Sequence, residues 1–257
     1  MKTDFTKLGE LGMWETWVQR VRDSMPNFCA NEIYVEQLSP GDDQFYEAMA
    51  KLKSRNWTLL DPEGRTRDAQ FGGIVRKIHR HGEMTRMWAD AQMEINFLSR
   101  FLPLRHARVL EIGGGYGRLA VILATLVHQY VCVDAVPMTT DLCKLYCSKF
   151  RPEVIVPTLA EFAQMAPTLE PTLAINVHSF NECTLEQIER WLDLLVEMKV
   201  GHLFTVSHGR ADGHEPPYRI WDGSGGDFRP LIEARFALVA EEANPIGNHP
   251  QALWVIK

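Results

Sequence analysis

Residues 108–120 of the chain read RVLEIGGGYGRLA. The apolar side chains of Val109, Leu110 and Ile112 form a short run of the kind that is buried in a parallel sheet. Four glycines follow within five positions, and apolar residues then recur at helical spacing up to residue 126. The stretch therefore predicts a buried strand that passes through a glycine turn into a helix. A nucleotide-type cofactor is the expected occupant of such a turn, because it can approach main-chain amides with no Cβ in the way.

The spacing of the glycines indicates which cofactor the turn accepts. The dinucleotide fingerprint needs glycine at its first, third and sixth positions. Counting from Gly113, the sixth position is Arg118, which disfavours NAD. The pattern ExGxGxG fits instead, with Glu111 ahead of Gly113, Gly115 and Gly117. This pattern resembles the first motif of class I S-adenosylmethionine-dependent methyltransferases.

The resemblance implies a fold, a cofactor and a set of binding residues. The implied fold is α/β and Rossmann-like, with a mostly parallel seven-stranded sheet and helices on both faces. In that family the acidic residue, here Glu111, lies near the methionine portion of S-adenosyl-L-methionine. The glycine loop, which includes Tyr116, wraps the methionine end and the ribose. This cofactor carries an ammonium group that a carboxylate can bind. It has no pyrophosphate, so the loop does not need a complete set of amides for binding an anion.

A second cofactor contact is expected at the end of the next strand. Residues 130–133 are apolar and rich in β-formers, and they end at Asp134, 23 positions beyond Glu111. A carboxylate there can accept hydrogen bonds from both ribose hydroxyls. NAD sites also use an acidic residue in this way, so this residue does not distinguish the two cofactors. Leu159 follows a third predicted strand over residues 153–156, at the sheet edge where the adenine would lie. The alternative is a glycine-rich turn with a capping Asp and no ligand.

Strands and helices alternate from residue 104 to residue 257, which predicts one S-adenosylmethionine-binding domain. Its predicted helices are residues 139–150 and 184–199, and its further strands are residues 173–177, 203–206, 236–239 and 252–256. The last two strands resemble the pair that closes such sheets with one antiparallel strand. Residues 1–103 predict a helical N-terminal extension that covers the substrate side. Its expected helices contain Trp14, Val18 and Val21, then Phe45, Met49 and Leu52, and finally residues 85–100.

A basic segment interrupts this extension. From Arg65 to Arg86 the chain carries six Lys or Arg residues against two acidic ones, in a protein whose net charge is −6. A lid hypothesis uses Gly72 and Gly73 as a hinge, with Arg65 and Arg67 binding a phosphate or carboxylate of the substrate. The alternative is a solvated helix face.

The second informative stretch is INVHSFNEC, residues 175–183, where a strand meets its loop on the same sheet edge as the glycine turn. Together, VLEIGGGYGRLA and NVHSFNE resemble a group of sugar O-methyltransferases associated with bacterial polysaccharide gene clusters. The resemblance covers roughly residues 105–200. It implies methyl transfer to a hydroxyl of a sugar or a sugar-containing acceptor, and the basic segment adds the expectation that this acceptor is anionic.

An alcohol is a poor nucleophile at neutral pH, so this reaction needs a general base. His178 is the best-placed candidate, because an unperturbed pKa near ~6.5 leaves it able to accept a proton. His208 competes with it, and Glu182 would orient either imidazole. Alternatively, Glu182 serves the fold, since Ser179–Glu182 and Thr184–Gln187 both have the spacing of a capping box.

Other polar and aromatic residues complete the predicted site. Asn181, Trp88 and Tyr218 are candidates for substrate contacts, the two rings by stacking on a sugar face, with core packing as their alternative role. A metal is another route to activating a hydroxyl, and four residues suggest one, namely His208, Asp212, His214 and Asp222. Their spacing matches no tight ligand pattern, so no metal is expected.

Composition limits the cellular compartment and the class of substrate that we expect. The net charge argues against a nucleic-acid substrate, and a small molecule or saccharide is expected. The five cysteines contain no CxxC pair, which favours a reducing cytoplasm, and Cys143 and Cys147 are predicted as small core residues. The sequence shows neither a signal peptide nor a membrane span of ~20 apolar residues. It carries no signal for an oligomeric state.

Three rival functions stay open at this point. The first is a small-molecule or peptide N- or O-methyltransferase of another pathway. The second is an inactive subunit that binds the cofactor and serves a partner enzyme. The third is an NAD-dependent oxidoreductase, which Arg118 disfavours.

Overall fold

The computed structural model describes ten segments of the chain and groups the residues into two compact units. The described segments are residues 5, 8, 14–23, 25, 27–30, 60–78, 82–208, 217–220, 225–244 and 249–257. The first unit comprises Met1–Met13, Pro103–Ala243 and His249–Lys257, and the second comprises Trp14–Leu102 and Asn244–Asn248.

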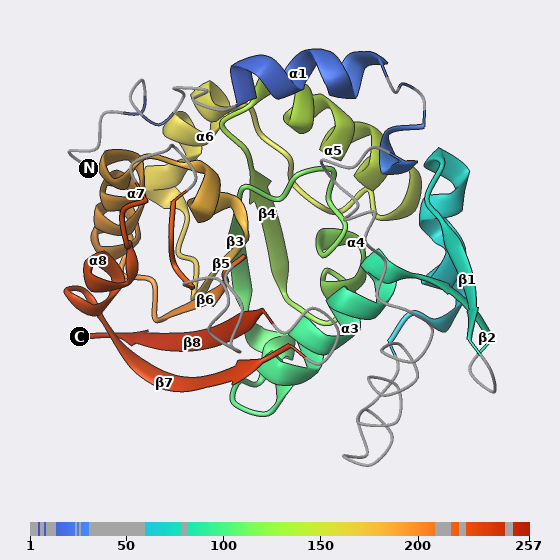
Figure 1. Cartoon of the computed structure of the whole chain (residues 1–257). Helices are drawn as coiled ribbons and strands as arrows, with labels where there is room; N and C mark the ends of the chain where they lie inside the picture. Colours follow the sequence, from blue (N-terminus) through green and yellow to red (C-terminus); the bar gives the residue numbers. More distant parts are fainter. Residues whose placement is uncertain are drawn as a thin grey trace. The chain divides into compact units, whose positions relative to one another are not determined.

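The first unit is built on a six-stranded sheet of order β4-β3-β5-β6-β8-β7 (Figure 1). Neighbouring strands from β4 to β6 are parallel, whereas β8 is antiparallel to both β6 and β7. The predicted α/β class and the single antiparallel strand are therefore confirmed. The strands are β3 Arg108–Ile112, β4 Gln129–Val133, β5 Leu173–Val177, β6 His202–Val206, β7 Phe236–Ala243 and β8 Pro250–Ile256.

The predicted strand over residues 153–156 is reduced to a single bridge, so the described part of the sheet has six strands rather than seven. Ile155 pairs with Val131 of β4, and its backbone exchanges hydrogen bonds with Tyr130 and Cys132 at 3.0 and 2.9 Å. Proline residues at positions 152 and 157 flank this short run. A proline has no N–H to give to a ladder, which limits the pairing to its centre.

Helices cover both faces of the sheet, with α4 and α5 on one face and α6, α7 and α8 on the other (Figure 1). The predicted helix after the glycine turn is much shorter than expected, because the turns after Leu123 close by i to i+3 hydrogen bonds. The helices and short 3₁₀ turns are η4 Leu104–His106, α4 Ala120–Leu123, α5 Pro137–Phe150, α6 Leu159–Met165, η5 Ala166–Thr168, η6 Ser179–Glu182, α7 Leu185–Glu197 and α8 Arg229–Glu233.

The two longest helices of this unit follow the predicted ranges closely. In α7, Ile188, Leu192 and Leu195 recur at helical spacing and are buried. In α5 the buried face holds Leu142 and Tyr146, but Leu145 is 44% exposed. A helix turns by about 100° per residue, which carries the side chain of Leu145 away from the buried face that holds Tyr146.

Residues near the N-terminus belong with the sheet unit. Leu8 is buried in the core that α7 forms with β3, β5 and β6. The Phe5 ring meets that of Phe162 edge-on, with centroids 5.9 Å apart. Leu8 and Phe5 therefore pack with the core of the sheet, Leu8 fully buried and Phe5 partly buried, although the sequence predicts that they belong to a separate helical extension over residues 1–103.

The second unit contains two predicted helices and a hairpin that the sequence did not predict. Helices α1 and α3 occupy the expected ranges, and the threonine hydroxyl of Thr85 caps α3. The hairpin was missed because its strands, VRKI and GEMT, do not alternate apolar with polar residues. The predicted helix with Phe45 lies outside the described residues. The elements are α1 Trp14–Asp23, η2 Phe28–Ala30, η3 Pro62–Phe71, β1 Val75–Ile78, β2 Gly82–Thr85 and α3 Arg86–Ser99.

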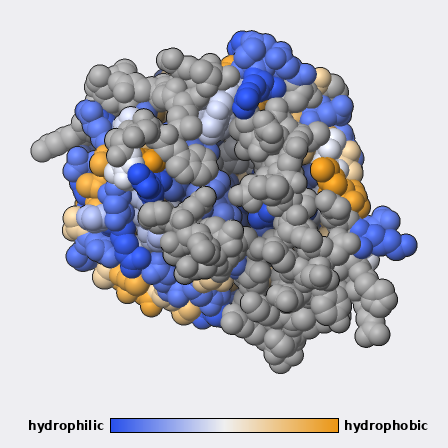
Figure 2. Space-filling view, in the orientation of Figure 1, coloured by the Kyte–Doolittle hydropathy of each residue, from blue (hydrophilic) through white to orange (hydrophobic). Residues whose placement is uncertain are grey.

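Strand β7 is an edge of the main sheet and carries exposed apolar side chains. Leu238 and Val239 are 44% and 47% exposed, and Figure 2 shows apolar surface over this strand. Glu241 and Glu242 follow on the same strand, and charges on an edge strand disfavour pairing with another sheet. In the part of the chain that the structure describes, no helix is long and apolar enough to span a bilayer.

Candidate functional site

The glycine turn interlocks with the segment that follows β5. Ile112 ends β3, and its carbonyl oxygen accepts hydrogen bonds from Asn176 Nδ2 at 3.1 Å and from Ser179 Oγ at 3.2 Å. Gly113 has a φ of +71°, and a Cβ there would lie 2.1 Å from Ser179 Oγ. The two informative stretches of the sequence are therefore one structural unit, in which glycine at position 113 makes room for Ser179.

This arrangement corrects one sequence prediction and confirms another. Ser179 Oγ bonds to Ile112 and Asn176, and the residue that caps η6 is His178, whose side chain makes no capping hydrogen bond. The Ser179–Glu182 capping box is therefore not formed. The Thr184–Gln187 box is present at the start of α7, with both of its reciprocal hydrogen bonds.

Glu111 supports the glycine turn from inside the protein. Its carboxylate accepts hydrogen bonds from the Tyr130 hydroxyl at 2.9 Å and from Cys132 Sγ at 3.5 Å. A Cβ on Gly114 would lie 2.9 Å from Glu111 Oε2, so the carboxylate packs directly beneath the loop. Burial raises the pKa of Glu111, whereas the Tyr130 hydrogen bond and the charge of Arg118 act to lower it. The predicted contact with the methionine portion stays a prediction.

The far end of the turn rests on a cluster of thiols. Gly117 has a φ of +91°, and a Cβ there would lie 2.8 Å from Cys147 Sγ. Cys143 Sγ lies 3.6 Å from Cys132 Sγ and 3.8 Å from Cys147 Sγ. All three are buried free thiols, which confirms Cys143 and Cys147 as small core residues. The hydrogen bond with Cys132 and burial raise the pKa of Cys143, whereas the contact with Cys147 acts to lower it.

Tyr116 does not present its ring at the surface of the loop. The side chain is buried, and its ring meets that of Tyr146 on α5 edge-on, with centroids 5.0 Å apart. Its backbone, rather than its ring, is therefore the part that the loop offers to a ligand.

Asp134 closes the loop from the end of β4. One carboxylate oxygen accepts the N–H of Gly115 at 3.3 Å and the other accepts the N–H of Val136 at 2.8 Å. Burial raises the pKa of Asp134 to about 6, although both hydrogen bonds act to lower it. An ionised carboxylate has about four acceptor positions. Asp134 can therefore hold the loop and still accept hydrogen bonds from a ligand.

Three histidines meet at the sheet edge where β5 and β6 end. The rings of His178 and His208 are stacked, with centroids 3.9 Å apart and planes 30° apart. The ring of His249 stands edge-on to His178, with centroids 5.1 Å apart, and lies 5.9 Å from His208. The two predicted base candidates are therefore neighbours, and the structure adds a third that the sequence analysis missed.

A topological signal could have revealed His249. Parallel strands end at the same edge, and a strand antiparallel to them begins there. The sequence predicted that the last strand is the antiparallel one, and His249 directly precedes β8. The histidine was overlooked because it lies 71 positions from His178 in the chain.

His178 has an unusual backbone conformation. Its φ is +66°, in the left-handed region that β-carbon-bearing residues rarely adopt. Such a conformation costs on the order of 1–3 kcal/mol and is concentrated at functional sites. The N–H of His178 bonds to the Val206 carbonyl at 2.8 Å, which fixes the loop against β6.

Asn181 and Glu182 lie in the 3₁₀ turn after His178. Asn181 is buried, and its Nδ2 donates to Ser207 Oγ at 3.2 Å and to the Arg219 carbonyl at 2.8 Å. Its Oδ1 accepts the backbone N–H of His208 at 3.2 Å. These contacts make Asn181 a positioning residue for His208 within the fold, whereas its predicted contact with a substrate stays a prediction. Glu182 ends the turn and is half-buried.

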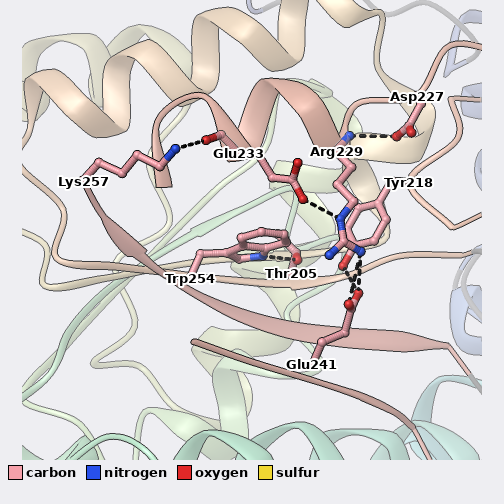
Figure 3. Close-up of polar contacts among 8 residues, drawn as sticks. All are labelled: Thr205, Tyr218, Asp227, Arg229, Glu233, Glu241, Trp254 and Lys257. Atoms are coloured by element: carbon pink, nitrogen blue, oxygen red, sulfur yellow. Dashed lines mark hydrogen bonds and ion pairs between the residues drawn. The ribbon is translucent and has the colours of Figure 1, made fainter. Parts of the chain in front are cut away.

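The buried side chain of Tyr218 is part of a network of polar contacts around Arg229 (Figure 3). Its hydroxyl donates to Glu241 at 2.7 Å, and its N–H donates to Ser207 Oγ at 2.8 Å. The Arg229 guanidinium lies 5.1 Å from the Tyr218 ring and 5.5 Å from the Trp254 ring, and it pairs with both oxygens of Glu241 at 3.1 Å. The ring of Tyr218 thus packs inside the fold, which is the alternative to stacking on a sugar.

Comparison with known proteins identifies the fold. No family model and no curated protein matches the chain. The glycopeptide N-methyltransferase MtfA complexed with S-adenosylhomocysteine is similar with a TM-score of 0.51 and 12% identity, over 65% of this chain and 90% of that one. Its complex with S-adenosylmethionine gives 0.50 and 12%, over 65% and 94%. The chain shares the Rossmann-like fold of this methyltransferase. The fibrillarin pre-rRNA processing protein of Methanococcus jannaschii is a further similar structure, with a TM-score of 0.47 and 14% identity over 72% and 83%.

The predicted residues of the basic segment, Arg65 and Arg67, lie in the second unit, where each contacts another residue of that unit. Arg67 pairs with Asp61 at 2.5 Å, and both side chains are largely buried. Trp88 is buried and donates from Nε1 to the Asp61 carbonyl at 3.0 Å. The Arg65 guanidinium lies 5.4 Å from the Trp88 ring. The residues from Arg65 to Phe71 belong to the 3₁₀ segment η3, Pro62–Phe71, rather than to an α-helix.

Two further predictions can be placed. Leu159 is the first residue of α6, half-buried against the core of the methyltransferase fold, and a capping box at Thr158 fixes its backbone. The residues of the metal alternative, Asp212, His214 and Asp222, lie outside the described part of the chain. Within that part, no three His, Cys, Asp or Glu residues are arranged to hold a metal ion.

Proposed function

We propose that the chain is an S-adenosylmethionine-dependent methyltransferase. The observation that carries the proposal is the convergence of three features on one edge of the sheet. These are the glycine turn after β3, the carboxylate of Asp134 after β4, and the histidines after β5 and β6. In open α/β sheets this edge is where ligands bind. The shared fold supports the proposal, because the structures of MtfA hold S-adenosylmethionine and its demethylated product.

The residues of the glycine turn fit this cofactor. Gly113, Gly115 and Gly117 all have positive φ, so the loop presents backbone rather than side chains. We expect Asp134 to accept hydrogen bonds from the hydroxyls of a ribose, since each of its oxygens can accept more than the one backbone hydrogen bond that it makes. Arg118 replaces the glycine that a dinucleotide site needs at that position. When bound, S-adenosylmethionine supplies a methyl group on a sulfonium.

The pKa of Asp134 gives the binding a pH dependence. With a pKa of about 6, the carboxylate is ionised at pH 7 and largely protonated at pH 5. Protonation removes acceptor capacity, so we expect affinity for S-adenosylmethionine to fall by about tenfold between these pH values. Calorimetric titrations at both pH values measure this change. The Asp134→Asn variant cannot titrate here and should show a flat profile; an equal fall in both proteins would assign the effect to another group.

The acceptor is a hydroxyl of a sugar or a sugar-containing molecule, with one of the edge histidines as the general base. The sequence favours His178, with His208 competing and Glu182 orienting the ring. A positioned base contributes about 10² to 10⁴ in rate, and alignment of the hydroxyl contributes up to ~7–11 kcal/mol. The resemblance of the VLEIGGGYGRLA and NVHSFNE stretches to sugar O-methyltransferases supports this acceptor class over a peptide or another small molecule.

The basic segment supports an anionic acceptor, such as an acidic sugar or a phosphate-linked saccharide. Arg65 and Arg67 are its proposed ligands, and Gly72, with a φ of +86°, is the proposed hinge. The enzyme would work in a reducing compartment such as the cytoplasm.

A transfer assay tests the function. The full chain is incubated with methyl-tritiated S-adenosylmethionine and four acceptor sets: neutral sugars, uronic acids, sugar phosphates and a short peptide. We expect labelled product from the uronic acids or sugar phosphates, with little from the neutral sugars and none in the Asp134→Ala control. Label on the peptide alone would replace the sugar assignment with the rival methyltransferase. Cofactor binding without label on any acceptor or in a cell extract would favour the inactive partner subunit.

A further inference from the structure

We propose that His249 is the general base of the methyl transfer, a role that rests on the proposed function. The proposal stands on three features of the described residues. These are the place where His249 enters the site, the hydrogen bond that sets its tautomer, and the chain of polar contacts behind that hydrogen bond.

The place of His249 follows from the sheet. Strands β5 and β6 run in parallel and end at Val177 and Val206, and the antiparallel β8 pairs Gln251 with Val206. The N–H of Ser207 bonds to the Pro250 carbonyl at 3.1 Å, so this pairing continues to Pro250, the residue that directly follows His249. His249 is therefore fixed to the same edge as the glycine turn by backbone pairing.

The hydrogen bond of His249 selects its tautomer. Nδ1 lies 3.1 Å from the backbone carbonyl oxygen of His208. A carbonyl oxygen only accepts, so Nδ1 carries the hydrogen and donates it. In the neutral ring the lone pair is then on Nε2. A general base needs this arrangement, in which one nitrogen is anchored and the other can accept a proton.

A chain of hydrogen bonds supports the anchoring carbonyl. Asn181 Oδ1 accepts the N–H of His208 at 3.2 Å, and the carbonyl of the same residue accepts from His249. Asn181 itself is buried and held by Ser207 and Arg219. When Nε2 takes a proton, the bond from Nδ1 to the carbonyl becomes charge-assisted and strengthens, which stabilises the imidazolium. The rings of His178 and His208 stack on each other, and the ring of His249 packs edge-on against that of His178.

The step balances as a nucleophilic substitution. The acceptor oxygen forms a bond to the methyl carbon as the bond from sulfur to that carbon breaks, and the electron pair of the broken bond stays on sulfur. The hydroxyl proton moves to Nε2 of His249, and the imidazolium later releases it to water. The products are a methyl ether, the neutral thioether and one proton.

Two measurements on the full chain test this role, and the first needs no acceptor. Nitrogen NMR of the labelled protein reports the tautomer of His249, assigned by comparison with His249→Gln. We expect the hydrogen on Nδ1 and a pyridine-like Nε2. A hydrogen on Nε2 would overturn the proposal, whatever the enzyme methylates.

The second measurement compares kcat for single variants, using the acceptor with the highest rate in the tritium assay. We expect His249→Ala to lose about 10² to 10⁴ in kcat, with an unchanged Kd for S-adenosylmethionine and partial rescue by added imidazole. His178→Ala should lose less, and His202→Ala, at the start of β6 on the opposite edge, should match the wild type. A kcat for His249→Ala within about threefold of wild type would assign the base elsewhere. If the wild type itself transfers no methyl group, the proposed function fails, whereas the NMR result still reports on the tautomer.

Discussion

Replacing Asp134 with alanine is expected to weaken S-adenosylmethionine binding by at least about a hundredfold. Hydrogen bonds to a charged group contribute about 1.5–3 kcal/mol each, and the carboxylate can accept one from each ribose hydroxyl. Each 1.4 kcal/mol is about tenfold in Kd. The variant also removes the acceptors for Gly115 and Val136, so the loop loses support. Calorimetric titration at pH 7 measures the change.

The Asp134→Asn variant is the matched control. It keeps one acceptor oxygen of nearly the same shape, and we expect it to lose less affinity than the alanine variant. A near-wild-type Kd for Asp134→Ala, in a protein whose thermal unfolding is unchanged, would show that the ribose is held elsewhere.

Replacing Gly113 with alanine is expected to destabilise the fold by about 3 kcal/mol or more. The left-handed backbone alone costs about 1–2 kcal/mol for a residue with a Cβ. The added Cβ would also lie 2.1 Å from Ser179 Oγ and 2.3 Å from its Cβ, which neither side can relieve without moving the 3₁₀ turn. Urea denaturation measures the loss, and cofactor affinity should fall with it, because the turn connects the loop to His178.

A double variant separates the two costs. In the background of Ser179→Gly the overlap disappears, so the further change Gly113→Ala should cost only the about 1–2 kcal/mol of the backbone term. If the alanine costs the same with and without Ser179, then the two stretches are not interlocked in the way that the hydrogen bonds to Ile112 indicate.

The elements that the sequence predicted correctly are those with strong local patterns. The glycine turn follows from its composition, and α7 follows from the regular recurrence of Ile188, Leu192 and Leu195. The terminal antiparallel pair was also predictable, because both strands are apolar and a turn-rich segment joins them. These features depend on residues close together in the chain, where periodicity is informative.

The parts of the site that could not be predicted depend on distant partners. Ser179 has the spacing of a capping residue, but Ile112, 67 positions away, takes its hydrogen bond. Asn181 was expected at the substrate, yet it bonds across 26 to 38 positions to Ser207 and Arg219. Local spacing in the sequence does not predict these hydrogen bonds, because the partners become neighbours only through the order of the strands in the sheet.

The most direct test of the central claim is calorimetric titration of the full chain with S-adenosylmethionine, S-adenosylhomocysteine and NAD. We expect saturable binding of S-adenosylmethionine at one site, competition by S-adenosylhomocysteine, and no heat from NAD. Saturable binding of NAD without binding of S-adenosylmethionine would contradict the claim that the glycine turn and Asp134 form a methyl-donor site.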